Sequence, residues 1–408
     1  MNRVELVAPA GDLEKLQFAL HYGADAVYLG GENFSLRQRA GNFTLDQMSL
    51  AREITREYGA KMYVAVNIFA RNYDLGSLAS YLTSLSRLKV DGLIISDPGI
   101  FLYAREYAPE LPITISTQAN TCNWKAVQFW QELGARRICL ARELTLREIQ
   151  DIRQKTSLEL EVFVHGSMCV AYSGRCLLSN YFLHRDSNRG DCAQPCRWRY
   201  HLVEEHRLDD PLLIEEDRSG TYLLSSKDLC MIEYLPLLIS AGVNSLKIEG
   251  RMRSLAYVSI VTKVYREAID AYLKSPHTFQ VQEEWLQELG HAAGREYTTG
   301  FYFDSHPRHS QAYQVSKSSP LYQIAGLVYE KSEGNRAAIK VCHQIGCGDM
   351  VEIFRNTPSL TKARVVALWN QEDEPAEILH PGAIGFLEAD KPLYKFDLIR
   401  KKVAESLA

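Results

Sequence analysis

The order of hydrophobic and polar positions divides the chain into repeated units up to about residue 275. Each unit is a short apolar run, a polar or glycine break, and then an amphipathic stretch. Runs this short and β-branched, without strict alternation, are typical of strands buried on both faces of a parallel sheet. The eight runs are Glu5–Ala8, Ala26–Leu29, Met62–Val66, Leu93–Ile95, Ile113–Ser116, Arg137–Leu140, Leu160–Val164 and Leu246–Ile248. Eight such units predict an α/β fold with a (β/α)8 barrel like that of TIM; an open doubly wound sheet is the alternative, since a sequence does not show closure.

The stretches between these runs predict helices. Asp12 is a good N-cap for the first helix, which carries leucines at helical spacing on one face. Thr44 and Gln47 form a capping box at the start of the second. The barrel is therefore predicted to span residues 1–275.

A second pattern begins near the C-terminal quarter of the chain. Residues 276–310 have the composition of a linker with one helix around Glu283–Leu289. From residue 311 to 408, short alternating strands are separated by glycines and prolines at regular spacing. This pattern predicts a small antiparallel β-barrel domain, a fold that binds oligonucleotides in some proteins and is only a packing module in others.

One connection is far longer than barrel loops usually are. About eighty residues separate His165, at the end of the seventh run, from Leu246 in the eighth. We therefore predict a long insertion after strand 7, over residues 166–244, and long insertions of this kind are usually functional. It contains five of the nine cysteines and a basic, aromatic stretch, Cys196 to His201.

Composition narrows the function classes. The chain has 408 residues, 46% of them hydrophobic and 24% charged, with a net charge of −4, which is typical of an ordinary globular protein. No apolar run is long enough to span a bilayer, and the first residues do not resemble a signal peptide. We therefore expect a cytoplasmic protein without a membrane partner, in which thiols stay reduced. Clustered cysteines in such a compartment indicate metal binding or redox chemistry.

The cysteine spacing favours a metal centre over a structural zinc knuckle. The five thiols of the insertion are Cys169, Cys176, Cys192, Cys196 and Cys230. They lack the paired CxxC motifs of structural zinc, and a thiolate-only site suits zinc or an iron–sulfur cluster. We predict Cys169, Cys176, Cys192 and Cys230 as metal and cofactor ligands, with Cys196 as the alternative to one of them. The other four, Cys122, Cys139, Cys342 and Cys347, are predicted to be small buried residues.

Polar side chains follow most of the predicted strands. Barrel enzymes place their chemistry at this end of the strands, so we predict a catalytic rim there. Its candidate catalytic residues are Asn67, Gln118, His165, Glu249, Arg251 and Arg253; Asp97, Arg142 and Glu143 follow strands in the same way. Polar turn residues without function are the alternative.

A hydrolase mechanism is a weaker hypothesis. The chain has neither a GxSxG elbow nor an HExxH helix. His165 and Cys169 are close enough in sequence to form a nucleophile pair, but no third, orienting group is evident.

The stretch from Glu161 to Ser179 resembles the signature of peptidase family U32, the collagenase-like proteins. The matching positions are Glu161, Phe163, Gly166, Ser167, Met168, Cys169, Gly174, Cys176, Leu178 and Ser179. ELVAPAGD near the N-terminus, Gly30–Phe43 and Leu246–Ser254 are similar to other blocks of that family.

The resemblance implies a function that composition does not. Members of the family that act in oxygen-independent quinone synthesis hold a [4Fe–4S] cluster through four cysteines, which correspond best to the four ligands predicted above. The branch of this length is similar to proteins that convert the wobble uridine of tRNA to 5-hydroxyuridine, with prephenate as co-substrate, and a longer branch modifies ribosomal RNA. The expected partners are therefore the tRNA anticodon region and prephenate, in a homo- or hetero-oligomer. A collagenase-like peptidase, a hydroxylation factor for ribosomal RNA or a quinone precursor, and a metal-free RNA-binding factor are the alternatives.

Particular residues suit an RNA substrate and a dicarboxylate. A base hydroxylase needs cations for phosphates and aromatic rings for a splayed base. The candidates for RNA binding are Arg37, Arg39, Arg197, Trp198 and Arg199. Prephenate would suit the paired guanidiniums of Arg251 and Arg253. The alternative is that these two arginines form rim salt bridges with Glu143 and Glu249.

Overall fold

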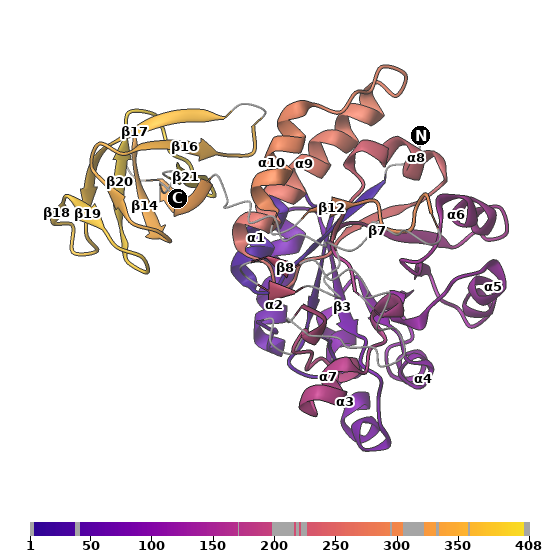
Figure 1. Cartoon of the computed structure of the whole chain (residues 1–408). Coiled ribbons are helices and arrows are strands. Elements are labelled where there is room, and N and C mark those ends of the chain that lie inside the picture. Colours follow the sequence, from indigo (N-terminus) through magenta and orange to yellow (C-terminus); the bar gives the residue numbers. More distant parts are fainter. Residues whose placement is uncertain are drawn as a thin grey trace. The chain divides into compact units, whose positions relative to one another are not determined.

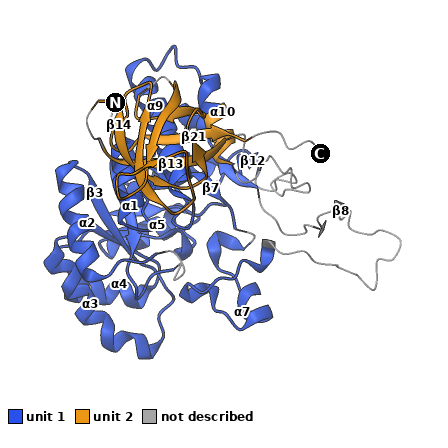
Figure 2. Cartoon of the chain, turned by 90° about the vertical axis from the view of Figure 1, so that its left-hand side faces the viewer, with its two compact units in different colours: residues 1–286, 295–317 blue, residues 287–294, 318–408 orange. Residues whose placement is uncertain are grey.

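The structure is a computed structural model that describes residues 4–36, 41–169, 171–197, 216–217, 220–221, 227–293, 296–304, 322–331, 334–357 and 360–403. The chain forms two compact units (Figure 2). Unit 1 comprises residues 1–286 and 295–317, and unit 2 comprises residues 287–294 and 318–408.

Unit 1 is built on a closed barrel of eight parallel strands, as the apolar runs predicted. Neighbouring strands pair in parallel around the whole ring, and β7 closes it by pairing with β11. The strands are β1 (Glu5–Pro9), β2 (Ala26–Gly30), β3 (Lys61–Val66), β4 (Gly92–Ile95), β5 (Ile113–Ile115), β6 (Arg137–Cys139), β7 (Glu159–Ser167) and β11 (Ser245–Ile248). The open-sheet alternative is therefore excluded.

Helices surround the strands of unit 1 (Figure 1). They are α1 (Leu13–His21), α2 (Leu45–Glu57), α3 (Leu75–Leu88), α4 (Pro98–Tyr107), α5 (Trp124–Glu132), α6 (Leu146–Arg153), α8 (Leu235–Ser240) and α9 (Leu255–Lys274), with short 3-10 turns η1 (Asn72–Asp74), η2 (Thr117–Ala119) and η6 (Ile232–Tyr234). Asp12 caps α1 by accepting a hydrogen bond from the Lys15 amide, and Thr44 and Gln47 form the predicted capping box. Both caps satisfy amides that the first helical turn leaves without partners. None of the described helices is both long and apolar enough to cross a bilayer.

The described first part of the long connection after β7 lines the pocket at the mouth of the barrel. The connection contains η3 (Tyr172–Gly174), α7 (Leu178–Leu183), η4 (Ser187–Arg189), η5 (Pro195–Arg197), β8 (Glu216–Asp217), β9 (Gly220–Thr221) and β10 (Asp228–Cys230). β10 returns antiparallel to the end of β7, with Cys230 opposite His165. We call residues 167–197 the cysteine loop.

Part of the stretch predicted as a linker, 276–310, is built into unit 1. β12 (Tyr297–Thr298) adds a parallel strand beside β10. The Tyr302 hydroxyl donates to the carbonyl oxygen of Phe163 on β7 at 2.6 Å. The helix expected in this stretch is α10 (Glu283–Ala292).

Unit 2 contains the antiparallel β-barrel predicted for the C-terminal region. Six strands close in the order β16, β21, β13, β14, β20 and β17, with β16 also paired to β17. The strands are β13 (Tyr322–Lys331), β14 (Arg336–Val341), β15 (Ile345–Gly346), β16 (Met350–Phe354), β17 (Thr361–Trp369), β18 (Pro375–Ala376), β19 (Ile378–Leu379), β20 (Ile384–Ala389) and β21 (Leu398–Lys402). Alternate strand residues fill one apolar core. The sequence pattern did not predict β21, in which Arg400 is buried.

Candidate functional site

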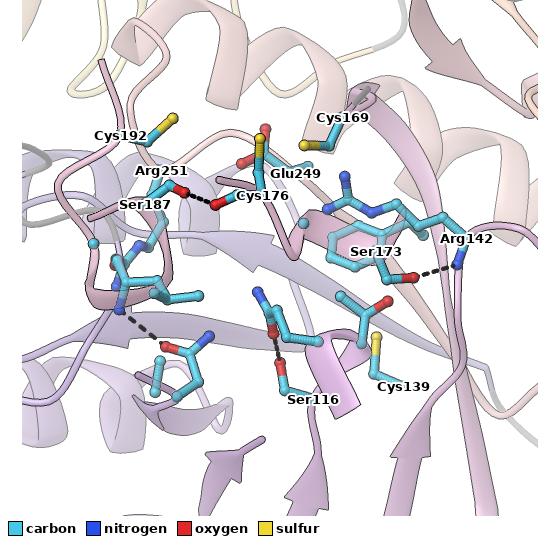
Figure 3. Close-up of a pocket in the computed structure, with 18 of the residues that line it drawn as sticks. Ser116, Cys139, Arg142, Cys169, Ser173, Cys176, Ser187, Cys192, Glu249 and Arg251 are labelled. Atoms are coloured by element: carbon cyan, nitrogen blue, oxygen red, sulfur yellow. Dashed lines mark hydrogen bonds between the residues drawn. The ribbon is translucent and has the colours of Figure 1, made fainter. Parts of the chain in front are cut away.

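The barrel mouth of unit 1 holds a pocket between the strand ends and the cysteine loop (Figure 3). Its floor is formed by strand residues, among them Tyr28, Ala65, Ile94, Phe163 and Lys247. Rim residues from several strand ends and residues of the cysteine loop complete the lining. The pocket therefore lies where a (β/α)8 barrel places its chemistry.

Four of the five clustered thiols line this pocket: Cys169, Cys176, Cys192 and Cys196, all half-buried. Figure 3 shows Cys176 between Cys192 and Cys169. Burial raises the pKa of the Cys176 thiol, and the nearby Cys169 and Cys192 raise it further. The Gln194 amide donates to the sulfur of Cys192 at 3.3 Å, the kind of hydrogen bond that surrounds the sulfurs of iron–sulfur clusters. Within the described residues, no three His, Cys, Asp or Glu side chains converge on the point that a single metal ion would occupy.

Cys230 lies on β10 and is not among the described residues that line the pocket. Burial raises the pKa of its thiol to about 11. Hydrogen bonds from the Ile232 amide and the Tyr265 hydroxyl lower this pKa, but their effect is smaller. Its sulfur is 4.0 Å from that hydroxyl. The structure thus brings together three of the four predicted ligands and Cys196.

The remaining cysteines differ in burial. Cys139 is buried at the pocket floor, and burial raises its pKa to about 12. Cys122 and Cys342 are half-buried. Cys347 is exposed, so its predicted burial is wrong, because it follows the short strand β15 at a turn on the surface of unit 2.

Two predicted rim residues, Asn67 and Gln118, line the pocket and also fix loops. The Asn67 side chain accepts a hydrogen bond from the Leu36 amide at 3.1 Å. Ser116 donates to the side-chain oxygen of Gln118. Asp97, which also follows a strand, is instead the N-cap of α4 and accepts hydrogen bonds from the Gly99 and Ile100 amides.

Arg251 and Arg253 follow the same strand but lie in different surroundings. Arg251 is buried, lines the pocket and donates to the Ser35 hydroxyl at 2.9 Å and to the Leu36 carbonyl. Arg253 donates to the Ser167 hydroxyl at 3.0 Å and forms an ion pair with buried Asp228. The rim salt bridge considered for Arg253 is therefore made with Asp228.

The two rim carboxylates lie elsewhere. Glu143 accepts hydrogen bonds from the amide and hydroxyl of Ser173 in the cysteine loop. Glu249 lines the pocket.

His165 is buried on β7 inside a cage of tyrosines. Its Nδ1 lies 3.4 Å from the Tyr265 hydroxyl and its Nε2 lies 3.3 Å from the Tyr297 hydroxyl. Burial, and to a smaller extent the charge of Arg253, lowers the pKa of His165 to about 3. The imidazole is therefore neutral near pH 7, and both ring nitrogens face tyrosine hydroxyls.

A column of buried charges below the pocket was missed by the sequence interpretation. Glu161 accepts hydrogen bonds from the Lys247 ammonium at 2.9 Å and the Arg137 guanidinium at 3.2 Å. Arg137 also reaches Glu5 at 2.6 Å and Glu159 at 2.7 Å. Burial alone would raise the pKa of Glu161, but the two cations lower it to about 2. Charged residues inside otherwise apolar strand runs were the available signal.

Most of the predicted RNA-binding residues fall outside the described part of the chain. This applies to Arg37, Arg39, Trp198 and Arg199, and to the side chain of Arg197. Their assignment to RNA binding stays a prediction.

The protein is a (β/α)8 barrel with thiols at its mouth, followed by a small antiparallel β-barrel. The pattern of peptidase family U32 matches residues 11–312, that of the peptidase family U32 C-terminal domain matches residues 321–400, and the chain belongs to this family.

Relatives within the family have more specific names. The chain is 41% identical to tRNA hydroxylation protein P1 of Bacillus subtilis, over 98% of this chain and 95% of the relative. It is 38% identical to tRNA hydroxylation protein P of Escherichia coli, over 87% and 86%. It is also 33% identical to a protein named collagenase from Porphyromonas gingivalis, over 74% of each chain.

Proposed function

We propose that the protein hydroxylates tRNA, converting the wobble uridine to 5-hydroxyuridine at carbon 5 without molecular oxygen and with prephenate as co-substrate. The observation that carries the proposal is the group of thiols over the catalytic end of the barrel, in a chain whose relatives are named for tRNA hydroxylation. A redox centre at the position where barrel enzymes act suits an oxidation of a base better than it suits peptide hydrolysis.

The residues at the mouth fit an iron–sulfur cluster. Cys169, Cys176 and Cys192 would hold three of its irons, and either Cys196 or Cys230 would supply the fourth thiolate. These thiols share one pocket, and a set of ligands made only of thiolates suits such a cluster. When bound, the cluster would supply one-electron redox chemistry.

The surrounding residues would hold the cysteine loop and the substrate. Glu143 fastens the loop through Ser173, and Asp74 fastens it through a bidentate ion pair with Arg189, at 2.6 and 2.8 Å. Because the loop lies over the pocket, a base that enters between them would be separated from bulk water. Tyr73 is 74% exposed beside Arg189, with the guanidinium carbon 5.1 Å from the ring centroid, and such a pair suits stacking of an unpaired base.

The proposal is tested by nucleoside mass spectrometry of tRNA from a knockout strain complemented with this chain. Wild type should restore 5-hydroxyuridine, and protein purified without oxygen should contain iron and sulfide. The Cys176→Ser variant should lose both properties, whereas Cys347→Ser, which changes an exposed thiol of unit 2, should keep them. Full iron and sulfide in a Cys169→Ser, Cys176→Ser double variant would exclude the cluster.

The fourth ligand is assigned by a pair of variants in the same experiment. Whichever of Cys196→Ser and Cys230→Ser loses iron changes a ligand; the other should keep the cluster. Tyr265→Phe controls for the environment of Cys230, since it removes the neighbouring hydroxyl and leaves the thiol.

Peptidase activity is the second candidate, because one relative is named collagenase. Its weakness is that the ring nitrogens of His165 face Tyr265 and Tyr297, not a thiol or hydroxyl nucleophile. Two results together would favour the peptidase. Wild type should hydrolyse gelatin and Cys169→Ser should not, and the knockout should contain as much 5-hydroxyuridine in its tRNA as the parent strain.

A further inference from the structure

The floor of the pocket contains a buried cation. Lys247 is 4% exposed and projects from β11 among aromatic rings, with its nitrogen 4.5 Å from the Tyr28 ring centroid and 5.7 Å from that of Phe163. Glu161 below it accepts hydrogen bonds from both Lys247 and Arg137, and Arg137 also pairs with Glu5 and Glu159. Lys247 also lines the pocket, so its charge can attract a further anion from that side.

A second cation reaches the same part of the pocket. Arg142 follows β6, and its guanidinium carbon lies 4.1 Å from the centroid of the Phe163 ring. One terminal nitrogen donates to the Ser167 carbonyl at 3.0 Å, whereas its buried Nε has no hydrogen-bond partner. Both Arg142 and Lys247 lower the pKa of Cys139, against the larger effect of burial that raises it. Figure 3 shows the Arg142 side chain reaching into the pocket below Cys169.

The charges around the pocket are unequal. Among the described residues that line it, three carry a positive charge, Arg142, Lys247 and Arg251, and one carries a negative charge, Glu249. The floor between them is apolar, with Ala65 and Ile94 facing the same space as Phe163. A ligand that fits this lining has an anionic end and a compact apolar body.

We propose that Arg142 and Lys247 bind the carboxylate of a small organic acid whose apolar body rests on the barrel floor. The inference deepens the proposed function, since prephenate, a dicarboxylate that bears one of its two carboxylates directly on an unsaturated ring, is an acid of this class. The proposal gives this role to Arg142 and Lys247 and not to Arg253. Arg253 pairs with Asp228 and is absent from the described pocket lining. A planar guanidinium and a point charge on one carboxylate give strong charge-assisted hydrogen bonds.

The test is direct binding of prephenate to protein purified without oxygen, measured by isothermal titration calorimetry. Arg142→Gln and Lys247→Met should each weaken binding about tenfold or more, because a buried charge-assisted contact is lost. Arg136→Gln is the matched control: this arginine has a side chain that is 70% exposed and lies outside the described lining of the pocket, and its variant should bind like wild type. Lys247→Gln, whose amide can still donate a hydrogen bond to Glu161 but carries no charge, replaces Lys247→Met if that variant fails to fold.

Two outcomes would overturn the inference. One is an unchanged affinity in Arg142→Gln and in the folded Lys247 variant, or no binding to wild type. The other is a loss of iron with unchanged affinity for prephenate, which would assign both cations to the cluster. The binding experiment is independent of the tRNA assay: prephenate binding with no 5-hydroxyuridine in the complemented knockout would refute the proposed function and leave the acid site standing.

Discussion

Replacing Glu161 with glutamine should destabilise unit 1 more than the same change at Glu159. The substitution keeps the shape but removes the charge that faces Lys247 and Arg137, both 5% exposed or less in their side chains. The pKa of about 2, compared with the usual 4.5, corresponds to about 3 kcal/mol of stabilisation near pH 7, at about 1.4 kcal/mol per pH unit. Breaking a buried ion pair usually costs roughly 3–5 kcal/mol, which agrees.

The assay is equilibrium unfolding in urea, followed by near-UV circular dichroism, for wild type, Glu161→Gln and the control Glu159→Gln. Glu159 also contacts Arg137, but its side chain is 29% exposed, so its loss should cost about 0–1 kcal/mol. Since the folded pKa of Glu161 is lowered, its contribution is complete above pH 4.5 and is lost as the pH falls towards 2. Equal stability of the two variants near pH 7 would refute the idea that the buried column depends on Glu161.

Three further predictions concern residues around the site and in unit 2. His165→Phe should flatten the pH dependence of the free energy of unfolding. Because the pKa of His165 in the folded protein is about 3, wild type is most stable above pH 6.5 and loses up to about 1.4 kcal/mol per pH unit below it. The same dependence on pH for both proteins, measured by urea unfolding, would contradict this. Gly166→Ala should lower the free energy of unfolding by about 1–3 kcal/mol, because φ is 106° and a Cβ would lie 2.5 Å from a backbone oxygen. The control Gly76→Ala, where a Cβ would meet open space, should not destabilise the protein. Equal melting temperatures of the two variants would refute the reasoning. Arg400→Met should destabilise unit 2 by roughly 3–5 kcal/mol, because it leaves Glu288 without this ion pair. Adding Glu288→Gln should recover part of the lost stability. Unchanged urea stability in Arg400→Met would contradict this.

The barrel was predictable because burial on both faces leaves a strong local record. A strand such as Gly92–Ile95 is buried at every position and carries no polar side chain, so the run and the helix after it could be placed without knowledge of the partners. The caps at Asp12 and Thr44 are likewise set by side chains within three residues. Strand β21 was not recognised because its buried Arg400 resembles a solvent-exposed position until Glu288 and Glu352 are known to surround it.

The site was predictable only in part, because it depends on contacts across the barrel. Clustering of Cys169, Cys176 and Cys192 in one loop indicated a common site, and the structure places all three at one pocket. The choice between Cys196 and Cys230 was beyond a sequence argument, since it depends on how β10 returns to β7. Arg253 looked equivalent to Arg251 by spacing, yet Asp228, from the far end of the insertion, takes up its charge.

The charged column connects the fold to the proposed chemistry. A barrel interior filled only with aliphatic side chains would offer the pocket an apolar floor, on which an anion would lose its hydration without compensation. Lys247 changes this floor, and Glu161 and Arg137 continue the chain of ion pairs from it to Glu5 at the opposite end. The stability of the column and the affinity for an acid should therefore be coupled. Glu161→Gln, if it folds, should alter prephenate binding although it does not line the described pocket, whereas Glu159→Gln should leave binding unchanged.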